Sequence, residues 1–538
     1  MDEKLNNTLY RSINPTDGDL IGEIQLTGSS EIDMVIENSN RAFYSWKNVP
    51  VAIRVKHLRK ALEWLIENSD SIAKLVTMGQ GKPYIESLGM ELIPSLDYLK
   101  YLTKNAERFL SELKPEYHQP LFAHKKGRII FEPIGTLLSI SPWNYPFLIP
   151  LIDLASSITC GNTIILKPAL ETIFTAKKLE EMCAAAEFPD GVVTVLAVSD
   201  DIASLLTAHP GIDKIIFTGS VETGKKVMIS ASKNLTPVIL ELGGKDAAIV
   251  CEDADIERSA KGIVWGAFCN AGQTCVGIER VYVEKSIASI FTEAVVNEVK
   301  KLKIGDPLMS DTDIGPMTVE SQMKTVSRHY EDALSKGATL EYGGIKNPDD
   351  ELGKHYLRPT VLTNVDHTMD VMSEETFGPI LPIMTVDSVD EAIKLANDSK
   401  YGLAASGWTR SRKTAKKIQE GIHSGQVTIN DSVYGFGEPG APWGGVKNSG
   451  FGRVHSRFGL MELLNIKFAD FDPSRKKAHL WWYPYTDELA NFYKIAYTAL
   501  YSTEMAKKLK SIILLLTFKR FWQRVSITSI LLRIRKLF

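Results

Sequence analysis

The fold of this chain is decided by the stretch Lys214-Ile215-Ile216-Phe217-Thr218-Gly219-Ser220-Val221-Glu222-Thr223-Gly224. A short apolar run, rich in β-branched and aromatic residues, ends at a glycine turn, and the turn opens a segment, 221–231, that is expected to be helical. The same order recurs through 135–241, where predicted strands at 136–140, 163–167, 192–197, 214–218 and 237–241 alternate with predicted helices. Five strands separated by helices predict a doubly wound parallel α/β sheet.

Polar and turn-forming residues stand where these predicted strands end. Asn144 follows the first strand, Lys167 and Pro168 end the second, Gly219 and Ser220 follow the fourth, and Glu241 ends the fifth. Ligands of such sheets bind beyond the carboxyl ends of the strands, so these residues are expected around one site. The turn 219–224 opens a helix and suits a phosphate group. No Gly-x-x-x-x-Gly-Lys-Ser/Thr motif is present, which argues against nucleotide hydrolysis.

A second α/β pattern occupies about 247–443. Its predicted strands include 247–250, 280–283 and 427–430, and its predicted helices include 286–302 and 389–397, whereas residues 31–105 are expected to be mainly helical. Cys275 falls near the start of this second pattern and Glu241 at the end of the first. Because ligand sites favour clefts between domains, these two residues fit a single site.

Two residues have the character of a nucleophile and its base. Cys275 closes the loop Asn270-Ala271-Gly272-Gln273-Thr274-Cys275, which suits a reactive thiol, and an ordinary buried cysteine is the alternative. Glu241 ends an apolar strand before Gly243-Gly244, where desolvation raises the pKa of a carboxyl group and favours a general base near neutral pH. A surface carboxylate that caps a turn is the alternative for Glu241.

The motif Pro142-Trp143-Asn144-Tyr145-Pro146 places a side-chain amide between two prolines that restrict the backbone. An asparagine held there can donate its amide N–H to a developing oxyanion. The alternative is a helix N-cap at Asn144 before a helix that starts at Tyr145.

Composition and charge restrict the class of protein. The 538 residues are 44% hydrophobic and 24% charged, with a net charge of −3, so several globular domains are expected and nucleic acid is not expected as a partner. The five cysteines are scattered, without Cys-x-x-Cys or His-x-His spacing, which argues against a disulfide scaffold and a structural zinc site; we expect no metal. The N-terminus has no apolar signal region, and no apolar run is long enough to span a bilayer, so a cytoplasmic location is expected.

Seven short motifs, in this order, resemble those of the aldehyde dehydrogenase superfamily over about residues 10–470. They are Ser141-Pro142-Trp143-Asn144-Tyr145-Pro146, Leu166-Lys167-Pro168-Ala169, Phe217-Thr218-Gly219-Ser220, Glu241-Leu242-Gly243-Gly244-Lys245, Gly272-Gln273-Thr274-Cys275, Glu374-Glu375-Thr376-Phe377-Gly378-Pro379 and Pro442-Trp443-Gly444-Gly445-Val446-Lys447-Asn448-Ser449-Gly450. The resemblance implies a cofactor-binding domain (1–113 and 134–243), an oligomerisation β-arm (114–133 and 460–472) and an α/β catalytic domain (244–459). A homodimer or homotetramer is then expected.

The resemblance also implies roles. Cys275 would attack the aldehyde carbon, Asn144 and the N–H of Cys275 would hold the oxyanion, and Glu241 would activate water to hydrolyse the thioester. NAD or NADP would accept the hydride, with Lys167 at the adenosine ribose, Glu375 at the nicotinamide ribose and Phe377 beside the ring. Gly219, Ser220 and Gly224 would follow the pyrophosphate, and we add the motif neighbours Trp143, Pro168 and Leu242. Relatives that prefer NAD often carry a glutamate three residues after this lysine. In this sequence that position is Leu170, and the acid is the next residue, Glu171. The choice between NAD and NADP therefore stays open.

Residues 473–538 extend beyond the resemblance. From Lys507 on every charged residue is positive, and Leu514, Phe518, Phe521, Val525 and Leu532 recur near one helical face, with Trp522 adjacent. A basic amphipathic helix of this kind is typical of peripheral membrane contact through 507–538, here on the cytoplasmic face. A helix that packs on its own protein or on a partner is the alternative.

The sequence therefore predicts NAD(P)-dependent oxidation of an aldehyde to a carboxylic acid, with a hydrophobic or long-chain aldehyde favoured by the tail. Tyr145, Ile149 and Ile152, on the helix after Asn144, are expected to line the substrate tunnel. A semialdehyde or other small-aldehyde dehydrogenase is one alternative. A CoA-acylating enzyme is disfavoured because Glu241 suits hydrolysis, and a non-catalytic protein on this fold is disfavoured because the three site residues occur together.

Overall fold

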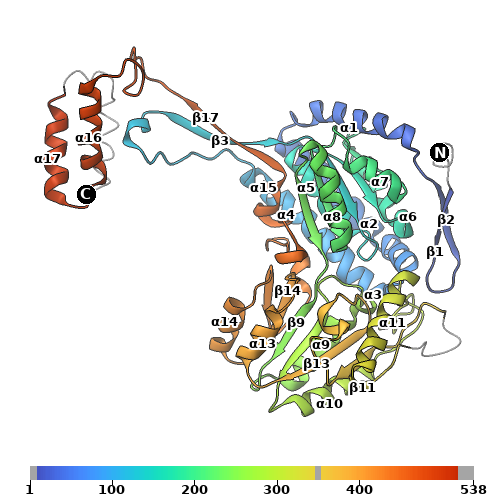
Figure 1. Cartoon of the computed structure of the whole chain (residues 1–538). Coiled ribbons are helices and arrows are strands. Elements are labelled where there is room, and N and C mark those ends of the chain that lie inside the picture. Colours follow the sequence, from blue (N-terminus) through green and yellow to red (C-terminus); the bar gives the residue numbers. More distant parts are fainter. Residues whose placement is uncertain (1–8, 346–352, 519–538) are drawn as a thin grey trace. The chain divides into compact units, whose positions relative to one another are not determined.

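The computed structural model of the chain describes residues 9–345 and 353–518 (Figure 1). The chain divides into two compact units. Unit 1 comprises Met1–Leu110 and Glu132–Asn465, and unit 2 comprises Ser111–Phe131 and Ile466–Phe538.

Unit 1 begins with an antiparallel hairpin followed by helices. The hairpin pairs β1 (Leu9–Ile13) with β2 (Leu20–Gln25), and the helices include α1 (Ile32–Trp46), α2 (Val51–Gln80), α3 (Tyr84–Glu86) and α4 (Ile93–Phe109), with a π-helical turn at Ser87–Leu92 before α4. Gly81, in the left-handed conformation with a φ of 91°, ends α2, because its N–H closes the last turn on the carbonyl oxygen of Thr77. The helices expected within 31–105 are confirmed.

The first sheet has six strands in the order β16-β8-β7-β4-β5-β6. These are β4 (Thr136–Ser141), β5 (Thr163–Pro168), β6 (Val193–Val195), β7 (Lys214–Gly219), β8 (Val238–Leu242) and β16 (Gly450–Phe451). The first five are parallel and alternate with α5 (Leu148–Cys160), α6 (Ile173–Ala185), α7 (Asp200–Thr207) and α8 (Val221–Ala231). The predicted doubly wound sheet is confirmed. β16, which pairs antiparallel with β8 from about two hundred residues later, was not predicted.

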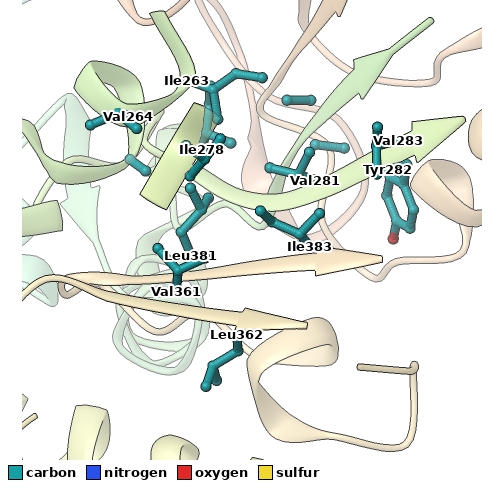
Figure 2. Close-up of a cluster of buried hydrophobic side chains, with 14 of the residues drawn as sticks. Ile263, Val264, Ile278, Val281, Tyr282, Val283, Val361, Leu362, Leu381 and Ile383 are labelled. Atoms are coloured by element: carbon teal, nitrogen blue, oxygen red, sulfur yellow. The ribbon is translucent and has the colours of Figure 1, made fainter. Parts of the chain in front are cut away.

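The second sheet has seven strands in the order β11-β12-β13-β10-β9-β14-β15. They are β9 (Asp246–Val250), β10 (Ile278–Glu284), β11 (Thr339–Tyr342), β12 (Thr360–Thr363), β13 (Ile380–Val386), β14 (Ala404–Trp408) and β15 (Gln426–Ile429). Its helices include α9 (Ile256–Phe268), α10 (Ala288–Val299), α11 (Glu320–Ser335), α12 (Asp370–Ser373), α13 (Val389–Asn397) and α14 (Arg412–Gly421). Figure 2 shows Val281, Ile383 and Ile263 among the buried side chains of this core, on β10, β13 and α9. Such dry packing on the sheet faces explains why its central strands read as continuous apolar runs.

Unit 2 combines a strand pair with two helices. β3 (Lys126–Pro133) pairs with β17 (Leu464–Phe471), and α16 (Asp487–Tyr501) packs on α17 (Met505–Leu516). The second segment of the arm, 460–472, was expected to begin at Leu460, but α15 (Ser456–Glu462) occupies that position and β17 begins at Leu464.

The described part of the C-terminal tail contains two helices, α16 and α17, and packs on its own chain. Leu515 and Phe518 contact the cluster around Leu480, Leu489 and Phe492, and the rings of Phe518 and Phe492 lie 5.6 Å apart. Phe521, Trp522, Val525 and Leu532 of the expected amphipathic face lie outside the described residues. No helix in the described part of the chain is long and apolar enough to cross a membrane.

Candidate active site

Cys275 lies directly after a tight loop that joins α9 to β10. Asn270, Ala271 and Gly272 are all left-handed, with φ angles of 55°, 54° and 76°. This conformation costs a non-glycine residue about 1–2 kcal/mol. At Gly272 a side chain is also excluded, because its Cβ would lie 2.4 Å from the carbonyl oxygen of Gly378. The loop therefore exists only because neighbouring groups hold it.

Side-chain amides hold the loop. The N–H of Asn270 donates to the Glu86 carboxylate at 2.8 Å, and its side-chain amide donates to the carbonyl oxygens of Asn144 and Gln273 at 3.2 and 3.1 Å. The amide nitrogen of Gln273 donates to the carbonyl oxygen of Asn270 at 3.0 Å, while its amide oxygen accepts the N–H of Thr318 at 2.9 Å. These bonds satisfy buried backbone groups that the irregular conformation leaves unpaired.

Asn144 is buried beside this loop. Its amide nitrogen donates to the carbonyl oxygen of Gln273, two residues before Cys275, at 2.9 Å. An amide nitrogen carries two hydrogens, so one can still donate to an atom bound at Cys275. The N-cap alternative is wrong, because α5 begins at Leu148 with Phe147 as its N-cap. For the same reason Tyr145 precedes the helix on which it was expected.

A buried ion pair supports Asn144 from the other side. Lys82 and Glu91 have no exposed side-chain surface, and the Lys82 ammonium lies 2.8 Å from a Glu91 oxygen and 3.0 Å from the carbonyl oxygen of Asn144. The second Glu91 oxygen accepts the N–H groups of Phe147 and Leu148, at 3.2 and 2.8 Å. Glu91 thus fixes the start of α5 while Lys82 fixes the backbone of Asn144.

Glu241 is buried in β8, so the alternative of a surface carboxylate is wrong. Neither carboxylate oxygen has a hydrogen-bond partner of good geometry among the described residues. Burial raises the pKa of Glu241 well above that of an exposed glutamate, and the nearby guanidinium of Arg453 opposes the rise in part. A desolvated carboxyl group without fixed donors is free to exchange a proton with a water or a thiol.

One cavity of about 250 Å³ is lined by Cys275, Glu241 and Asn144 together. Eight further residues singled out in the sequence line it: Trp143, Ile149, Ile152, Gly219, Ser220, Leu242, Glu375 and Phe377. The rings of Trp143 and Phe377 meet edge to face, with centroids 5.7 Å apart. Sequence reasoning therefore identified most of the polar lining, whose residues come from both sheets.

Lys167, Pro168 and Gly224 are not among the residues that line this cavity. Lys167 and Pro168 end β5, next to β4, and the Lys167 ammonium pairs with Asp200 at 3.0 Å. Gly224 is buried in the first turn of α8, where an added Cβ would lie 2.6 Å from the Leu242 side chain.

A second cavity, of about 330 Å³, also reaches Cys275. Of the three residues expected to line a substrate tunnel, Tyr145 and Ile149 line this cavity, whereas Ile152 lines the first cavity alone. Its other lining residues, which sequence reasoning missed, include Met90, Leu148, Trp265, Val276, Val433, Tyr434, Phe436 and Glu438. They come from distant segments and share no local motif. Cys275, Ile149 and Phe436 line both cavities, so the thiol lies where the two meet.

Residues 2–469 match the model of the aldehyde dehydrogenase family. The chain belongs to this family. It is accordingly an oxidoreductase that oxidises aldehydes with NAD or NADP, as the sequence predicts. A 4,4'-diapolycopene aldehyde oxidase from Methylomonas sp is 37% identical over 89% of both chains, and a glutarate-semialdehyde dehydrogenase from Pseudomonas putida is 34% identical over 86% of this chain and 94% of its own.

Solved structures of a betaine aldehyde dehydrogenase and of an NADP-dependent enzyme are similar to this one. A betaine aldehyde dehydrogenase from Staphylococcus aureus, in complex with NAD+, is similar with a TM-score of 0.84 and 30% identity, over 90% of this chain and 95% of that chain. An NADP-dependent enzyme from E. coli is similar with a TM-score of 0.82 and 34% identity, over 86% and 95%.

The Cys275 thiol of this aldehyde dehydrogenase stands apart from the other four cysteines, which are buried, because it is half-buried and lines both cavities. Burial raises its pKa, and the carboxylates of Asp246, Glu375 and Glu241 raise it further. The free enzyme therefore holds a protonated thiol, and a base must take its proton before it can act as a nucleophile.

Glu375 is held at the cavity by a second buried network. It accepts the N–H of Gly244 at 3.0 Å, and burial raises its pKa to about 8. Behind it, the Lys245 ammonium pairs with Glu279 at 2.6 Å, and Glu279 accepts the N–H of Phe377 at 2.8 Å. The network ties the Gly-Gly corner after β8 to the Glu375–Phe377 turn, although these are about 130 residues apart in sequence.

Proposed function

We propose that this aldehyde dehydrogenase oxidises a hydrophobic aldehyde to its carboxylic acid through a thiohemiacetal and a thioester on Cys275. One observation carries the proposal: a thiol, a desolvated carboxyl group and a free amide N–H line a single cavity, which meets a mostly apolar cavity at the thiol.

In the first step Glu241 takes the thiol proton, directly or through a water, and the sulfur of Cys275 attacks the carbonyl carbon. The resulting oxyanion accepts hydrogen bonds from the free amide N–H of Asn144 and the backbone N–H of Cys275. NAD or NADP, held by the residues that line the first cavity, would accept the hydride that leaves the former aldehyde carbon, and a thioester on Cys275 would remain. Once Glu241 has passed the thiol proton to solvent, it takes a proton from water, which attacks the thioester carbon. Glu241 returns this proton to the sulfur as the C–S bond breaks, so the acid and the thiol are released.

The residues of the first cavity fit a dinucleotide. Gly219 and Ser220 open α8, where Ser220 caps the helix by accepting the N–H of Thr223, and a helix N-terminus favours a pyrophosphate. Glu375 offers carboxylate oxygens to ribose hydroxyl groups, and the edge-to-face pair of Trp143 and Phe377 borders the space for a flat ring. We assign Lys167, Pro168 and Gly224 to the outer part of the same binding path, and Leu242 to its floor.

A hydrophobic substrate is favoured by the lining of the second cavity. Ile149, Trp265 and Phe436 are typical of its walls, and Glu438 is the one charged side chain among its described lining residues. The relative from Methylomonas sp is named for an aldehyde of 4,4'-diapolycopene. A small-aldehyde or semialdehyde substrate is the second candidate, since other relatives are named for aminoaldehydes and for glutarate semialdehyde. The described lining offers no lysine or arginine to a substrate carboxylate, which favours the first candidate.

The test is a panel of straight-chain aldehydes of increasing length, with glutarate semialdehyde and an aminoaldehyde, assayed with NAD and with NADP. We expect kcat/KM to rise with chain length, by about threefold or more per added methylene while the cavity is filling, and to be lowest for the semialdehyde. A preference for the semialdehyde would refute the substrate assignment alone. Acyl-CoA, rather than acid, as the product would refute the role of Glu241.

We also propose that the β3–β17 strand pair mediates self-association into a dimer or tetramer. Ile466, Phe468 and Phe471 of β17 are more than half exposed, which is unusual for large apolar side chains on one short strand. Mass measurement in solution of the Phe468→Ser and Phe471→Ser variants tests the proposal, which predicts a smaller species.

For the tail we propose peripheral membrane contact through 507–538. Leu509, Ile513 and Leu516 of α17 are exposed, and Lys507 and Lys508 lie at its start, which supports an interfacial helix. Co-sedimentation with vesicles that contain anionic lipid should be lost when the chain is cut after Thr503. Equal sedimentation of the two forms would contradict the proposal.

A further inference from the structure

Three side chains of unit 2 converge although two of them are 348 residues apart in sequence. The Nε2 atom of His124 lies 3.2 and 3.3 Å from the two carboxylate oxygens of Asp472, and the Nε2 atom of His479 lies 2.9 Å from the second of these oxygens. One nitrogen or oxygen atom from each of the three residues lies within 4.8 Å of the others. Both imidazoles therefore direct the same ring nitrogen at the same carboxylate oxygen.

These separations match the ligand shell of a small divalent ion. Zn²⁺ binds imidazole nitrogen and carboxylate oxygen at about 2.0–2.2 Å, so ligand atoms on a tetrahedron around it are about 3.3–3.5 Å apart. The nitrogen–oxygen distances, 3.2 and 3.3 Å from His124 and 2.9 Å from His479, lie at or just below this value, so binding an ion needs side-chain shifts of only a few tenths of an ångström. Two imidazoles and one carboxylate form a donor set that favours zinc and its neighbours over magnesium or calcium.

The cluster has its own supporting shell. The His479 ring stacks on Trp481, with centroids 4.7 Å apart and planes within 6°, and meets Trp482 edge to face at 4.7 Å. Asp472 is oriented by the N–H of Ser474, which donates to it at 2.8 Å. His124 and His479 expose only 13% and 9% of their side chains, so little water competes for their nitrogens. Apolar walls and an oriented carboxylate are what a bound ion requires around its ligands.

We propose that His124, Asp472 and His479 bind one divalent transition-metal ion, of which Zn²⁺ fits best, and that the ion ties the segment after β17 to the loop before β3. Water completes the coordination. Leu480, next to His479, packs on Leu489 and Phe492 of α16, so the ion fixes the start of the helical extension. The sequence predicted no metal because no closely spaced ligand motif is present, and only one pair of these ligands, Asp472 and His479, is near in sequence.

A structure without metal could hold the same cluster by hydrogen bonds from both imidazoles to Asp472, so the experiment must measure the ion itself. Full-length protein carrying Cys275→Ser, which removes the half-buried thiol as a competing ligand, is freed of metal with a chelator. It is then titrated with Zn²⁺ and with Co²⁺, and metal is counted by mass spectrometry after gel filtration. We expect one equivalent per chain, and visible absorption bands of four-coordinate Co²⁺.

Variants assign the binding to the cluster. His124→Ala, His479→Ala and Asp472→Asn should each weaken binding by at least about tenfold, since loss of even an outer partner of a metal site has that effect. His423→Ala, which changes an exposed histidine of unit 1, should bind as the parent does. Asp472→Asn keeps the size and a hydrogen-bonding oxygen, so it reports on binding if a histidine variant fails to fold.

Two results would overturn the proposal. In the first, the parent retains less than about 0.1 equivalent of metal per chain and shows no Co²⁺ bands, so the three residues form a hydrogen-bonded cluster only. The other is unchanged binding in folded Asp472→Asn and His479→Ala. Both are independent of the aldehyde chemistry of unit 1.

Discussion

Lys82→Met tests whether the buried ion pair beneath Asn144 supports both the fold and the site. The substitution keeps the length of the side chain and removes the ammonium, so the Glu91 carboxylate remains fully buried with only the N–H groups of Phe147 and Leu148 as partners. Removing one partner of a buried pair destabilises a protein by about 3–5 kcal/mol. Because two backbone donors remain, we expect a loss near the lower end, about 3 kcal/mol.

The same substitution should loosen Asn144. Its carbonyl oxygen loses the Lys82 bond of 3.0 Å and keeps only the longer bond, 3.2 Å, from the Asn270 amide. Misplacing a group that orients the oxyanion lowers the rate of the chemical step, and we expect kcat to fall about ten- to a hundredfold with KM little changed.

The control is the double variant Lys82→Met/Glu91→Gln, in which no charge is left unpaired. The glutamine oxygen still accepts the N–H groups at the start of α5, so most of the lost stability should return, whereas kcat should stay low because Asn144 still lacks its donor. Stability is measured by urea unfolding and by thermal inactivation rate, and kcat by single-turnover kinetics. A single variant as stable and active as the parent, or a double variant no more stable than the single one, would refute the reasoning.

Three further substitutions test the site more directly. Asn144→Ala should lower kcat by about 10²–10³-fold without changing the binding of cofactor, as measured by fluorescence titration. Glu241→Gln should stop hydrolysis of the thioester, while a burst of reduced cofactor remains at high pH and is measured by stopped flow. In the parent the steady-state rate should rise with pH, because burial raises the pKa of Glu241 and only its ionised form is a base. Asp153 of α5 lines the first cavity, and its carboxyl group accepts the Ser139 hydroxyl at 2.6 Å. Burial raises the pKa of this carboxyl group to about 7, so the unfolded chain loses the proton at a lower pH than the folded chain does. This group therefore lowers the stability of the parent as pH rises from about 4 to 7. Asp153→Asn should remove this loss, which is about 3 kcal/mol in urea unfolding at pH 5 against pH 8.

The first sheet could be predicted because each strand–turn–helix unit carries its own local pattern. Lys214–Gly219 reads as a strand from its side chains alone, and Ser220 caps the helix that follows it. Site residues were predicted for the same reason, since Glu241 differs from its apolar neighbours at a strand end and Cys275 closes a polar, glycine-containing loop. β16 has no such pattern, because it consists of only two residues, which pair with β8 from far along the chain.

The walls of the second cavity escaped prediction for a related reason. Met90, Trp265 and Phe436 are ordinary apolar residues in their own segments, and only the packing of unit 1 brings them to Cys275. Apolar residues that line a cavity and apolar residues that fill a core follow the same helical and strand periods. Substrate specificity, which depends on these walls, is therefore the part of the function least visible in the sequence.

The Lys82–Glu91 pair shows why buried charges escape prediction even when they are close in sequence. Lys82 follows the left-handed Gly81 that ends α2, and Glu91 lies in the π-helical turn Ser87–Leu92, so neither residue continues a regular helical period. A lysine and a glutamate between helices read as solvated surface residues. Burying both is tolerated because each also binds backbone groups, and those groups belong to Asn144 and the start of α5. An irregular, fully buried charge pair in this position is therefore explained by the site that it supports. For this reason, removal of the pair should lower kcat as well as the free energy of unfolding.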